Sequence, residues 1–172
     1  MSMRHGLRLG LVLAALALGG CERLMERQVE ENIRRDTHLL ESPDMTVVLC
    51  GTGSPIADPE RASACTVVVA GGQLVMVDAG PGSWEILDLS RLPTRALSAV
   101  LLTHFHSDHI GDLGEAMTQS WIAGRAESLP VYGPPGTKQV VDGFVAAYAQ
   151  DAAYRTLHHD AAHMPPAAAP AV

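Results

Sequence analysis

Aromatic residues, cysteines and basic residues are all scarce in this chain of 172 residues. Phe, Trp and Tyr make up only 4% of it, so the core must be built from the aliphatic side chains within its 47% hydrophobic content. Three cysteines without C-x-x-C spacing argue against a disulfide-rich scaffold and against a thiolate zinc site. Twelve basic against 19 acidic residues give a net charge of −7, which leaves no broad basic face for nucleic acid. Length and composition together indicate one globular domain.

The first twenty residues have the pattern of an export signal. A basic start at 4–8 precedes an uncharged run at 9–20, which would form a helix of about 18 Å, too short for a bilayer core of about 30 Å. The run ends in Leu18-Gly19-Gly20-Cys21, which resembles the lipobox of bacterial lipoproteins. We therefore predict a lipoprotein-type signal peptide at 1–20 and lipidation of Cys21. The chain would then be exported and anchored to a bacterial membrane facing the periplasm, with the outer membrane weakly favoured; an ordinary signal or a buried N-terminal helix is the alternative.

Residues 21–44 are predicted to form a charged helical linker. Glu30–Arg34 and Glu31–Arg35 are favourable i,i+4 pairs, and only a thin apolar stripe runs along the segment. The mixed charges favour a solvated helix over one that lies on a membrane surface. Removal of residues 1–20, which contain two arginines and no acidic residue, leaves 10 basic and 19 acidic residues, a net charge of −9.

The remaining chain alternates apolar runs with turns, as in an α/β domain, which we place at 45–160. The last twelve residues, 161–172, contain six alanines and three prolines and are expected to be a tail rather than a packed element. Cys50 and Cys65 lie in two predicted strands, and we favour two core thiols over a disulfide. The predicted strands are 45–50, 65–70, 74–78, 98–103 and 129–133, and the predicted helices are 83–91, 109–123 and 136–149.

One short segment gathers the side chains that can carry chemistry. Residues 103–109 read Thr-His-Phe-His-Ser-Asp-His, after a predicted buried strand and before a predicted helix. His104 and His106 share a face in extended backbone, so both imidazoles can contact one metal ion, and Asp108 and His109 can contact a second. Imidazole nitrogen with carboxylate oxygen suits zinc, with manganese and iron as alternatives. A loop at the carboxyl end of a strand is where α/β proteins place their sites.

The pattern H-x-H-x-D-H at 104–109 resembles the metal-binding signature of the metallo-β-lactamase superfamily. Val77-Asp78-Ala79-Gly80 is similar to the superfamily's Asp-x-Gly turn. Gly51-Thr52-Gly53-Ser54-Pro55 and the stretch 129–136 are similar to segments of its ribonuclease Z-like branch, in the same order. The resemblance covers about 45–160. It implies an αβ/βα sandwich, a site for two zinc ions and a metal-bound hydroxide that attacks an ester, phosphodiester or amide.

The resemblance also implies a role for each residue of the motif. His104 and His106 would hold the first ion, and Asp108 and His109 the second. Asp108 would also be the catalytic residue that orients or deprotonates the attacking water. Asp78 would brace a metal ligand from behind; the alternative is that it caps the following helix.

The later metal ligands of the family have no match in this chain. Of the histidines after the motif, none lies in a matching context, and for His158 and His159 we favour an exposed helix end over a place at the pocket rim. The chain is therefore expected to form about the first half of the sandwich, a mixed sheet with helices on one face. It would hold at most one weakly bound zinc ion, and the uncovered face of the sheet would favour self-association.

Three functions are compatible with these patterns. The first is an exported metal-dependent hydrolase that acts on a small-molecule or phosphodiester substrate, with nucleic acid disfavoured by net charge and export. The second is a truncated, catalytically inactive lipoprotein that lacks the later ligands. The third is a structural or binding lipoprotein with a vestigial motif. Bound metal separates the first function from the other two.

Overall fold

The structure is a computed structural model that describes residues 37–161 and 164–169. The predicted signal peptide, the lipidation site at Cys21 and most of the linker lie outside these residues. The described part of the linker contains the short helix α2 (His38–Glu41), which ends at Ser42. Among the helices of the described ranges, none combines the length and the apolar composition needed to cross a membrane.

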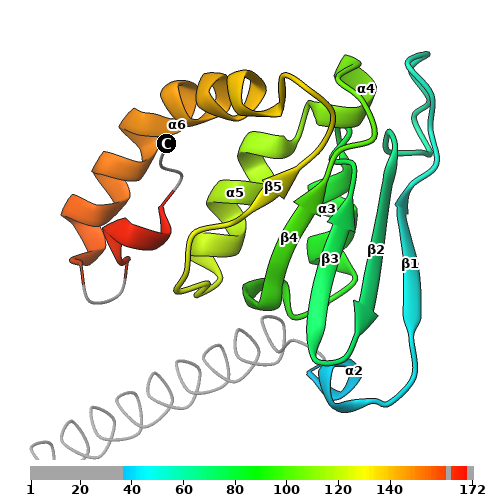
Figure 1. Ribbon diagram of the computed structural model, residues 1–172, viewed down its shortest axis with the longest axis horizontal. Helices are drawn as coiled ribbons and strands as arrows, with labels where there is room; N and C mark the ends of the chain where they lie inside the picture. Colours follow the sequence, from blue (N-terminus) through cyan, green and yellow to red (C-terminus); the bar gives the residue numbers. More distant parts are fainter. Residues whose placement is uncertain (1–36, 162–163, 170–172) are drawn as a thin grey trace, which may run out of the picture. The chain divides into compact units, whose positions relative to one another are not determined.

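A mixed sheet with the strand order β1-β2-β3-β4-β5 organises the described residues (Figure 1). The first three strands pair antiparallel, whereas β4 pairs parallel with both β3 and β5. Gly71 and Gly72 form the turn between β2 and β3, and both have a positive φ, as the double glycine predicts. All five predicted strands are present, although the last is shorter than predicted. Their bounds are β1 (Thr46–Gly51), β2 (Cys65–Ala70), β3 (Gln73–Val77), β4 (Leu97–Leu101) and β5 (Val131–Tyr132).

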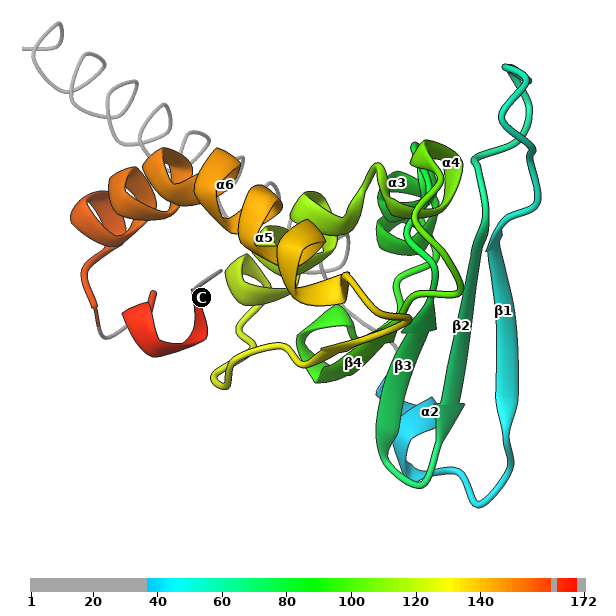
Figure 2. The same ribbon diagram turned by 45° about the horizontal axis from the view of Figure 1, so that its top comes forward.

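The helices α3 (Ser83–Leu89) and α5 (Leu113–Ile122) cover one face of this sheet. The side chains of the strands alternate between buried and partly exposed, so only one face of each strand enters the core. Figures 1 and 2 show the two helices beside the sheet from two directions. The predicted mixed sheet with helices on one face is confirmed. The core side chains that the strands and these helices share include Val67, Val69, Leu74, Met76, Trp84, Leu87, Val100, Leu113 and Met117.

The single helix predicted at 109–123 is wrong, because the chain breaks into α4 (Ser107–Ile110) and α5. At the break, the Asp112 N–H donates to the carbonyl oxygen of Ala79 at 2.8 Å. Gly111 also packs so closely on Pro81 that a Cβ at this position would collide with the proline ring. These contacts outweigh the continuous helical pattern and tie the motif to the turn after β3.

The described residues near the end of the chain pack more closely than their composition predicts. The last long helix, α6 (Thr137–His159), continues past the predicted end at residue 149. Met164 and Ala168 pack with Trp121 in a second buried cluster, so the prediction of an unpacked tail is wrong for these residues. The cause is the fully buried Trp121, whose indole N–H needs an acceptor and donates to the carbonyl oxygen of Pro165 at 3.1 Å.

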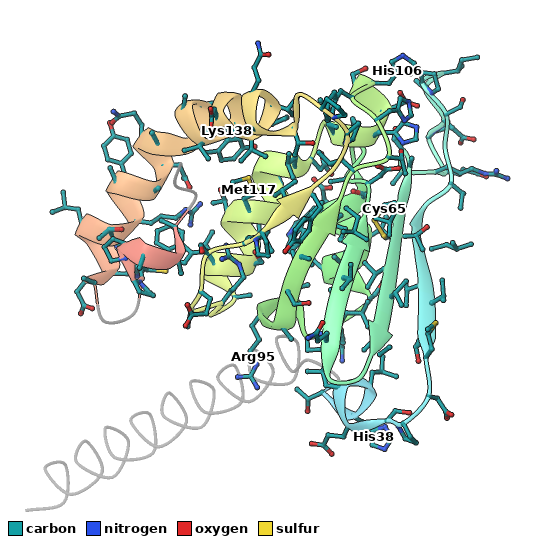
Figure 3. All side chains as sticks on the ribbon, in the orientation of Figure 1. His38, Cys65, Arg95, His106, Met117 and Lys138 are labelled. Atoms are coloured by element: carbon teal, nitrogen blue, oxygen red, sulfur yellow. A yellow bond between two sulfur atoms is a disulfide. The ribbon has the colours of Figure 1, made fainter. Side chains whose placement is uncertain are left out.

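Cys50 and Cys65 form a disulfide between β1 and β2, so the preference for two separate thiols is wrong (Figure 3). Their Cα atoms are 5.0 Å apart, within the usual range for a disulfide. Both residues are also buried in the core, at 1% and 2% exposure. The two cysteines are therefore both disulfide-bonded and buried in the core, whereas the sequence alone suggested that they are either one or the other. The bond closes the loop at 51–64.

We expect the double substitution Cys50→Ala/Cys65→Ala to lower the free energy of unfolding by about 3 kcal/mol, as loop entropy predicts for a closed loop of about this length. Urea unfolding of the oxidised protein, the reduced protein and the double variant measures the loss. Reductant must leave the double variant unchanged, which is the internal control. A double variant as stable as the oxidised protein would contradict the prediction.

Candidate metal centre

The H-x-H-x-D-H segment lies at the edge of the sheet where β3 and β4 end. β4 ends at Leu101, His106 has extended backbone, and α4 begins directly after it. Because β3 and β4 are parallel neighbours, the residue after β3 reaches the same edge, and the Asp78 N–H donates to the carbonyl oxygen of Leu101 at 2.9 Å. Figure 3 shows His106 at this edge. The topology thus brings Asp78 beside Thr103, which precedes the motif and lies 25 residues later along the chain.

The buried carboxylate of Asp78 is the centre of a hydrogen-bond network. Its Oδ1 accepts the backbone N–H of Thr103 at 2.8 Å. Its Oδ2 accepts the hydroxyl of Thr103 and the Nδ1–H of His109, each at 2.8 Å. The alternative role as a helix cap is wrong, because the N–H of Trp84 in the first turn of α3 donates to Asp112 instead, at 3.1 Å. Asp78 has a φ of 59°, a left-handed conformation that aspartate adopts more readily than most residues.

This network selects which ring nitrogens are available to a metal. His109 donates through Nδ1–H, so its Nε2 carries the lone pair. The hydroxyl of Thr103 donates its proton to Asp78, so its oxygen accepts the Nδ1–H of His104 at 3.0 Å. The Nε2 of His104 then also carries a lone pair. One carboxylate therefore orients two motif histidines, His109 directly and His104 through Thr103, a residue to which sequence analysis assigned no role.

The motif presents its donor atoms as two pairs. In the first pair, the Nδ1–H of His106 donates to the Nε2 of His104 at 3.0 Å, so the lone pair of His106 lies on its own Nε2. In the second pair, the Nε2 of His109 lies 3.6 Å from the Oδ2 of Asp108. Ligands about 2.0–2.1 Å from a tetrahedral zinc ion lie about 3.3 Å from one another, so the spacing of the second pair is close to that of two zinc ligands. Among residues 37–161 and 164–169, no three His, Cys, Asp or Glu side chains are grouped to hold an ion. The motif therefore offers pairs of ligands rather than a complete set.

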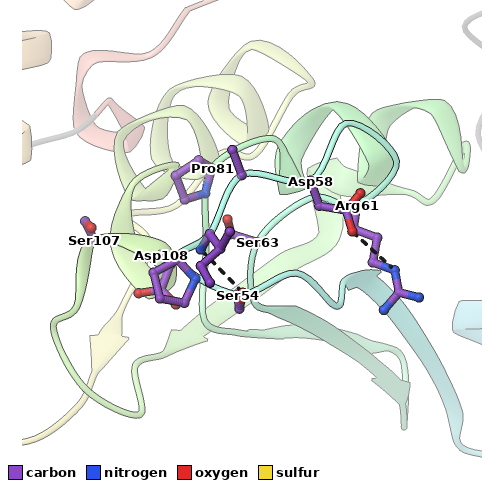
Figure 4. Close-up of a pocket in the computed structure, with 10 residues that line it drawn as sticks. Ser54, Asp58, Arg61, Ser63, Pro81, Ser107 and Asp108 are labelled. Atoms are coloured by element: carbon purple, nitrogen blue, oxygen red, sulfur yellow. Dashed lines mark hydrogen bonds and ion pairs between the residues drawn. The ribbon is translucent and has the colours of Figure 1, made fainter.

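A pocket of about 320 Å³ opens beside Asp108 (Figure 4). The disulfide-closed loop forms one wall with Asp58 and Arg61, whose carboxylate and guanidinium lie 3.8 Å apart. Pro81 and Ser107 belong to the opposite wall, and the buried Asp108 is 8% exposed. The pocket thus places the carboxylate of Asp108 next to a wall that carries one positive and one negative side chain.

Close backbone contacts hold the two walls together. The Gly80 N–H donates to the carbonyl oxygen of Ala64 at 2.9 Å, and the Ser63 N–H donates to that of Pro81 at 3.0 Å. A Cβ at Gly80 would collide with the carbonyl oxygen of Asp108, so this approach requires glycine. The turn after β3 is therefore packed between the loop and the motif.

Asp112 is an acidic residue beside the motif to which the sequence pattern assigns no role. Burial raises the pKa of its carboxyl group above the usual value, and the hydrogen bond from the Trp84 N–H offsets part of that rise. Asp112 lies three residues after the motif, and nothing in the sequence distinguishes it from an ordinary aspartate in a helix.

His158 and His159 do not join the motif. They are the exposed last residues of α6, with their rings in contact at a centroid distance of 4.7 Å. Figures 1 and 2 both show this end of α6 away from α4. The structure thus places them at a surface helix end, as favoured from the sequence.

Comparisons with known proteins agree with this geometry. The family model described as "Metallo-beta-lactamase superfamily" matches residues 58–159. Ribonuclease Z of Mycobacterium marinum is 46% identical over 123 residues, which are 70% of this chain and 44% of that protein. Ribonuclease Z of Mycobacterium bovis is 44% identical over 125 residues, or 71% of this chain and 45% of that protein. The chain thus spans a little under half the length of these curated relatives.

Two solved structures share the fold. The metallo-beta-lactamase fold protein YhfI from Bacillus subtilis is 25% identical with a TM-score of 0.50, and the match covers 58% of this chain and 40% of that one. Human tRNase Z, short form, is 24% identical with a TM-score of 0.53, covering 61% of this chain and 39% of that one. The predicted superfamily and ribonuclease Z-like branch are confirmed.

We expect Asp78→Asn to release the ring orientation of both His104 and His109. An amide nitrogen in place of Oδ2 cannot accept the hydrogen bonds of the Thr103 hydroxyl and of His109, and a displaced Thr103 hydroxyl no longer orients His104. Thr103→Val should release His104 alone, since His109 still donates directly to Asp78. Nitrogen-15 NMR of the imidazole rings reports which ring nitrogen carries the proton. Thr103→Ser keeps the hydroxyl and is the matched control, with both tautomers unchanged. An unaffected His109 in Asp78→Asn would contradict the assigned network.

Proposed function

We propose that this chain, which belongs to the metallo-beta-lactamase superfamily, carries out metal-dependent hydrolysis at the loop that contains His104, His106, Asp108 and His109. By family it is a ribonuclease Z-like hydrolase. The observation that supports the metal most directly is the Asp78 network, because it places the lone pairs of His104 and His109 on Nε2, the nitrogen through which each ring would bind an ion. Zinc is the metal that the nitrogen and carboxylate donors favour.

Each residue of the site has a distinct part in this proposal. A bound zinc ion would supply a Lewis acid and would lower the pKa of a water molecule. His104 and His106 hold an ion, and Asp108 orients the attacking water or accepts its proton. Asp78 and Thr103 do not contact the ion; they fix the ring tautomers of His104 and His109 through hydrogen bonds. The pocket beside Asp108 receives the substrate.

The number of ions follows from the ligands in the described residues. A catalytic zinc ion usually has three protein ligands and one open position, whereas each pair of the motif supplies two. The four side chains lie on one short loop, and sharing one ion would require them to move closer together than the structure places them. We therefore propose at most one weakly held zinc ion, in place of the two held by the complete family site.

The proposed substrate is a small ester or phosphodiester. The names of the curated relatives indicate RNA for those proteins. The net charge of −7 and the small number of basic residues disfavour a long polyanion for this chain. The guanidinium of Arg61 in the pocket wall provides a positive charge for a single phosphate or sulfate group.

A second candidate function is a catalytically inactive lipoprotein. It is favoured by the incomplete set of ligands among the described residues. The export and membrane anchoring proposed for either function rest on the pattern that ends at Cys21. The Cys50–Cys65 disulfide supports an exported location, because such bonds persist in oxidising compartments.

The metal content and the hydrolytic activity of the chain test this proposal. We expect at most one zinc ion per chain by elemental analysis and zinc-dependent hydrolysis of bis(p-nitrophenyl) phosphate only slightly above background. His106→Ala should abolish both, because it removes one ligand from a pair. The double variant His158→Ala/His159→Ala is the matched control and should behave as the wild type.

The outcomes separate the two candidate functions. If the chain binds zinc but shows no hydrolysis that depends on Asp108, the inactive lipoprotein is favoured. The Asp108→Ala variant measures that dependence. A chain that binds no zinc overturns the metal-dependent hydrolase. Two tightly held ions per chain with turnover that needs Asp108 would refute the proposed count and would mean that further residues or another chain complete the site.

The anchoring proposal has its own test in a Gram-negative host. We expect the chain to sediment with membranes and to lose about 20 residues, as lipoprotein processing requires. Cys21→Ser should release it from the membrane or leave it unprocessed. Leu157→Ser is the control, since Leu157 is exposed and lies far from the signal in the sequence. A soluble cytoplasmic chain that retains Met1 would refute the proposal.

A further inference from the structure

The Cys50–Cys65 disulfide lies in the neck of the loop that forms one wall of the pocket in Figure 4. The neck of this loop is formed by residues 50–53 and 62–65. The register of β1 with β2 shifts between Leu49 and Gly51, so Cys50 is the extra residue of a bulge and pairs with no residue of β2 in the ladder. A Cβ at Gly51 would collide with the carbonyl oxygen of Ser63, so the two limbs of the neck approach closely. The disulfide therefore joins the limbs where the strand pairing is interrupted.

The outer part of the loop has few other attachments. Every residue from 54 to 61 is exposed, so no side chain of this segment is anchored in the core. Beyond the strand ladder, the limbs are joined by a hydrogen bond from the Gly53 N–H to the carbonyl oxygen of Ala62 at 2.7 Å. The hydrogen bonds that Ser54 and Asp58 accept are local, since their donors are backbone N–H groups two residues later. The position of this wall therefore depends on the neck.

The neck is linked to the motif through backbone atoms. Ala64, the neighbour of Cys65, accepts the N–H of Gly80 at 2.9 Å. A Cβ at Gly80 would collide with backbone atoms of both Ala64 and the motif. Ala79 in turn donates to the carbonyl oxygen of His109 at 2.8 Å. Because backbone atoms at such close approach have no rotamers with which to adjust, a displacement of the neck is transmitted to the motif.

The oxidation state of the two cysteines changes the packing of the neck. A dithiol partner reduces the bond by exchange: the S–S bond breaks, the two cysteines take up two electrons and two protons, and the partner's own thiols become a disulfide. Two unbonded sulfur atoms cannot stay at bonding distance. Cys50 and Cys65 are 1% and 2% exposed, so the packed core leaves no free space for this separation. The limbs of the neck must move apart instead.

We infer that the Cys50–Cys65 disulfide is a positioning element whose formation by oxidation fixes the pocket wall at 54–61 and, through Gly80, the backbone of the motif. In the reduced chain, the wall and the motif are no longer held in register. The pocket is therefore complete only in an oxidising compartment. This inference rests on the proposed function in taking the pocket as the substrate site, whereas the coupling itself requires no bound metal.

Amide NMR spectra and hydrogen exchange of the 172-residue chain test the inference in the oxidised protein, the reduced protein and the double variant Cys50→Ala/Cys65→Ala. Without the bond, we expect the Gly53 amide to exchange at least about tenfold faster, because its hydrogen bond across the neck opens locally. The Gly80 amide signal should shift, since its acceptor moves. The amide of Leu74, which is buried on β3, should keep its chemical shift.

Val69→Ala is the matched control for a loss of stability alone, because Val69 is fully buried on β2 and lies four residues from Cys65. It creates a cavity in the core and should leave the Gly53 and Gly80 amides as in the wild type. Unchanged Gly53 and Gly80 amides in folded, reduced protein overturn the inference and leave the disulfide with a purely stabilising role. The same changes in Val69→Ala as in the reduced protein also overturn it.

Titration with inorganic phosphate separates this inference from the proposed function. The oxidised protein should bind phosphate at least about fivefold more tightly than the reduced protein, because the guanidinium of Arg61 is held in the wall only with the bond intact. Arg61→Ala should lose this binding while the Gly80 amide keeps its signal. Equal binding in both oxidation states overturns the inference. If phosphate binds neither form, the proposed substrate group is wrong, and the Gly53 and Gly80 amides alone decide the inference.

Discussion

The buried carboxylate of Asp78 joins the ends of two parallel strands and orients two histidines of the motif. A buried carboxylate is costly unless its oxygens are hydrogen-bonded, and this one accepts three bonds from two residues. Those bonds hold Thr103 against the end of β3 and fix the ring of His109. The loop of the motif is therefore shaped by these hydrogen bonds, and its geometry depends on the parallel pairing of β3 with β4.

The backbone around this carboxylate is equally constrained. Ala79 donates to the carbonyl oxygen of His109 and accepts from the N–H of Asp112, so the turn after β3 pairs with the segment that joins α4 to α5. Gly80 lies between this segment and the loop closed by the disulfide. Because the three segments touch through backbone atoms, a shift in one is transmitted to the others. This arrangement explains why the helix breaks after the motif and why the pocket forms beside Asp108.

The sheet itself presents two surfaces with different consequences. One face builds the core with aliphatic side chains, as the low aromatic content requires. The other face has the same kind of side chains without a cover among the described residues. The period-two alternation of a strand normally puts polar residues on the solvent side. Here β2 and β3 carry aliphatic or methionine side chains on both sides, which is the pattern of a sheet that packs against something on each face.

The sequence alone determined the order of the strands and helices, the superfamily and the position of the motif. These features depend on local patterns, namely apolar periodicity, the double-glycine turn and the spacing H-x-H-x-D-H. The tertiary structure decided what depends on residues distant in the chain. Asp78 reaches Thr103 and His109 only through strand pairing, and Trp121 recruits the alanine-rich end only because its indole is buried. Cys50 and Cys65 pair because antiparallel strands bring their Cα atoms within 5.0 Å, a distance that no spacing in the sequence encodes.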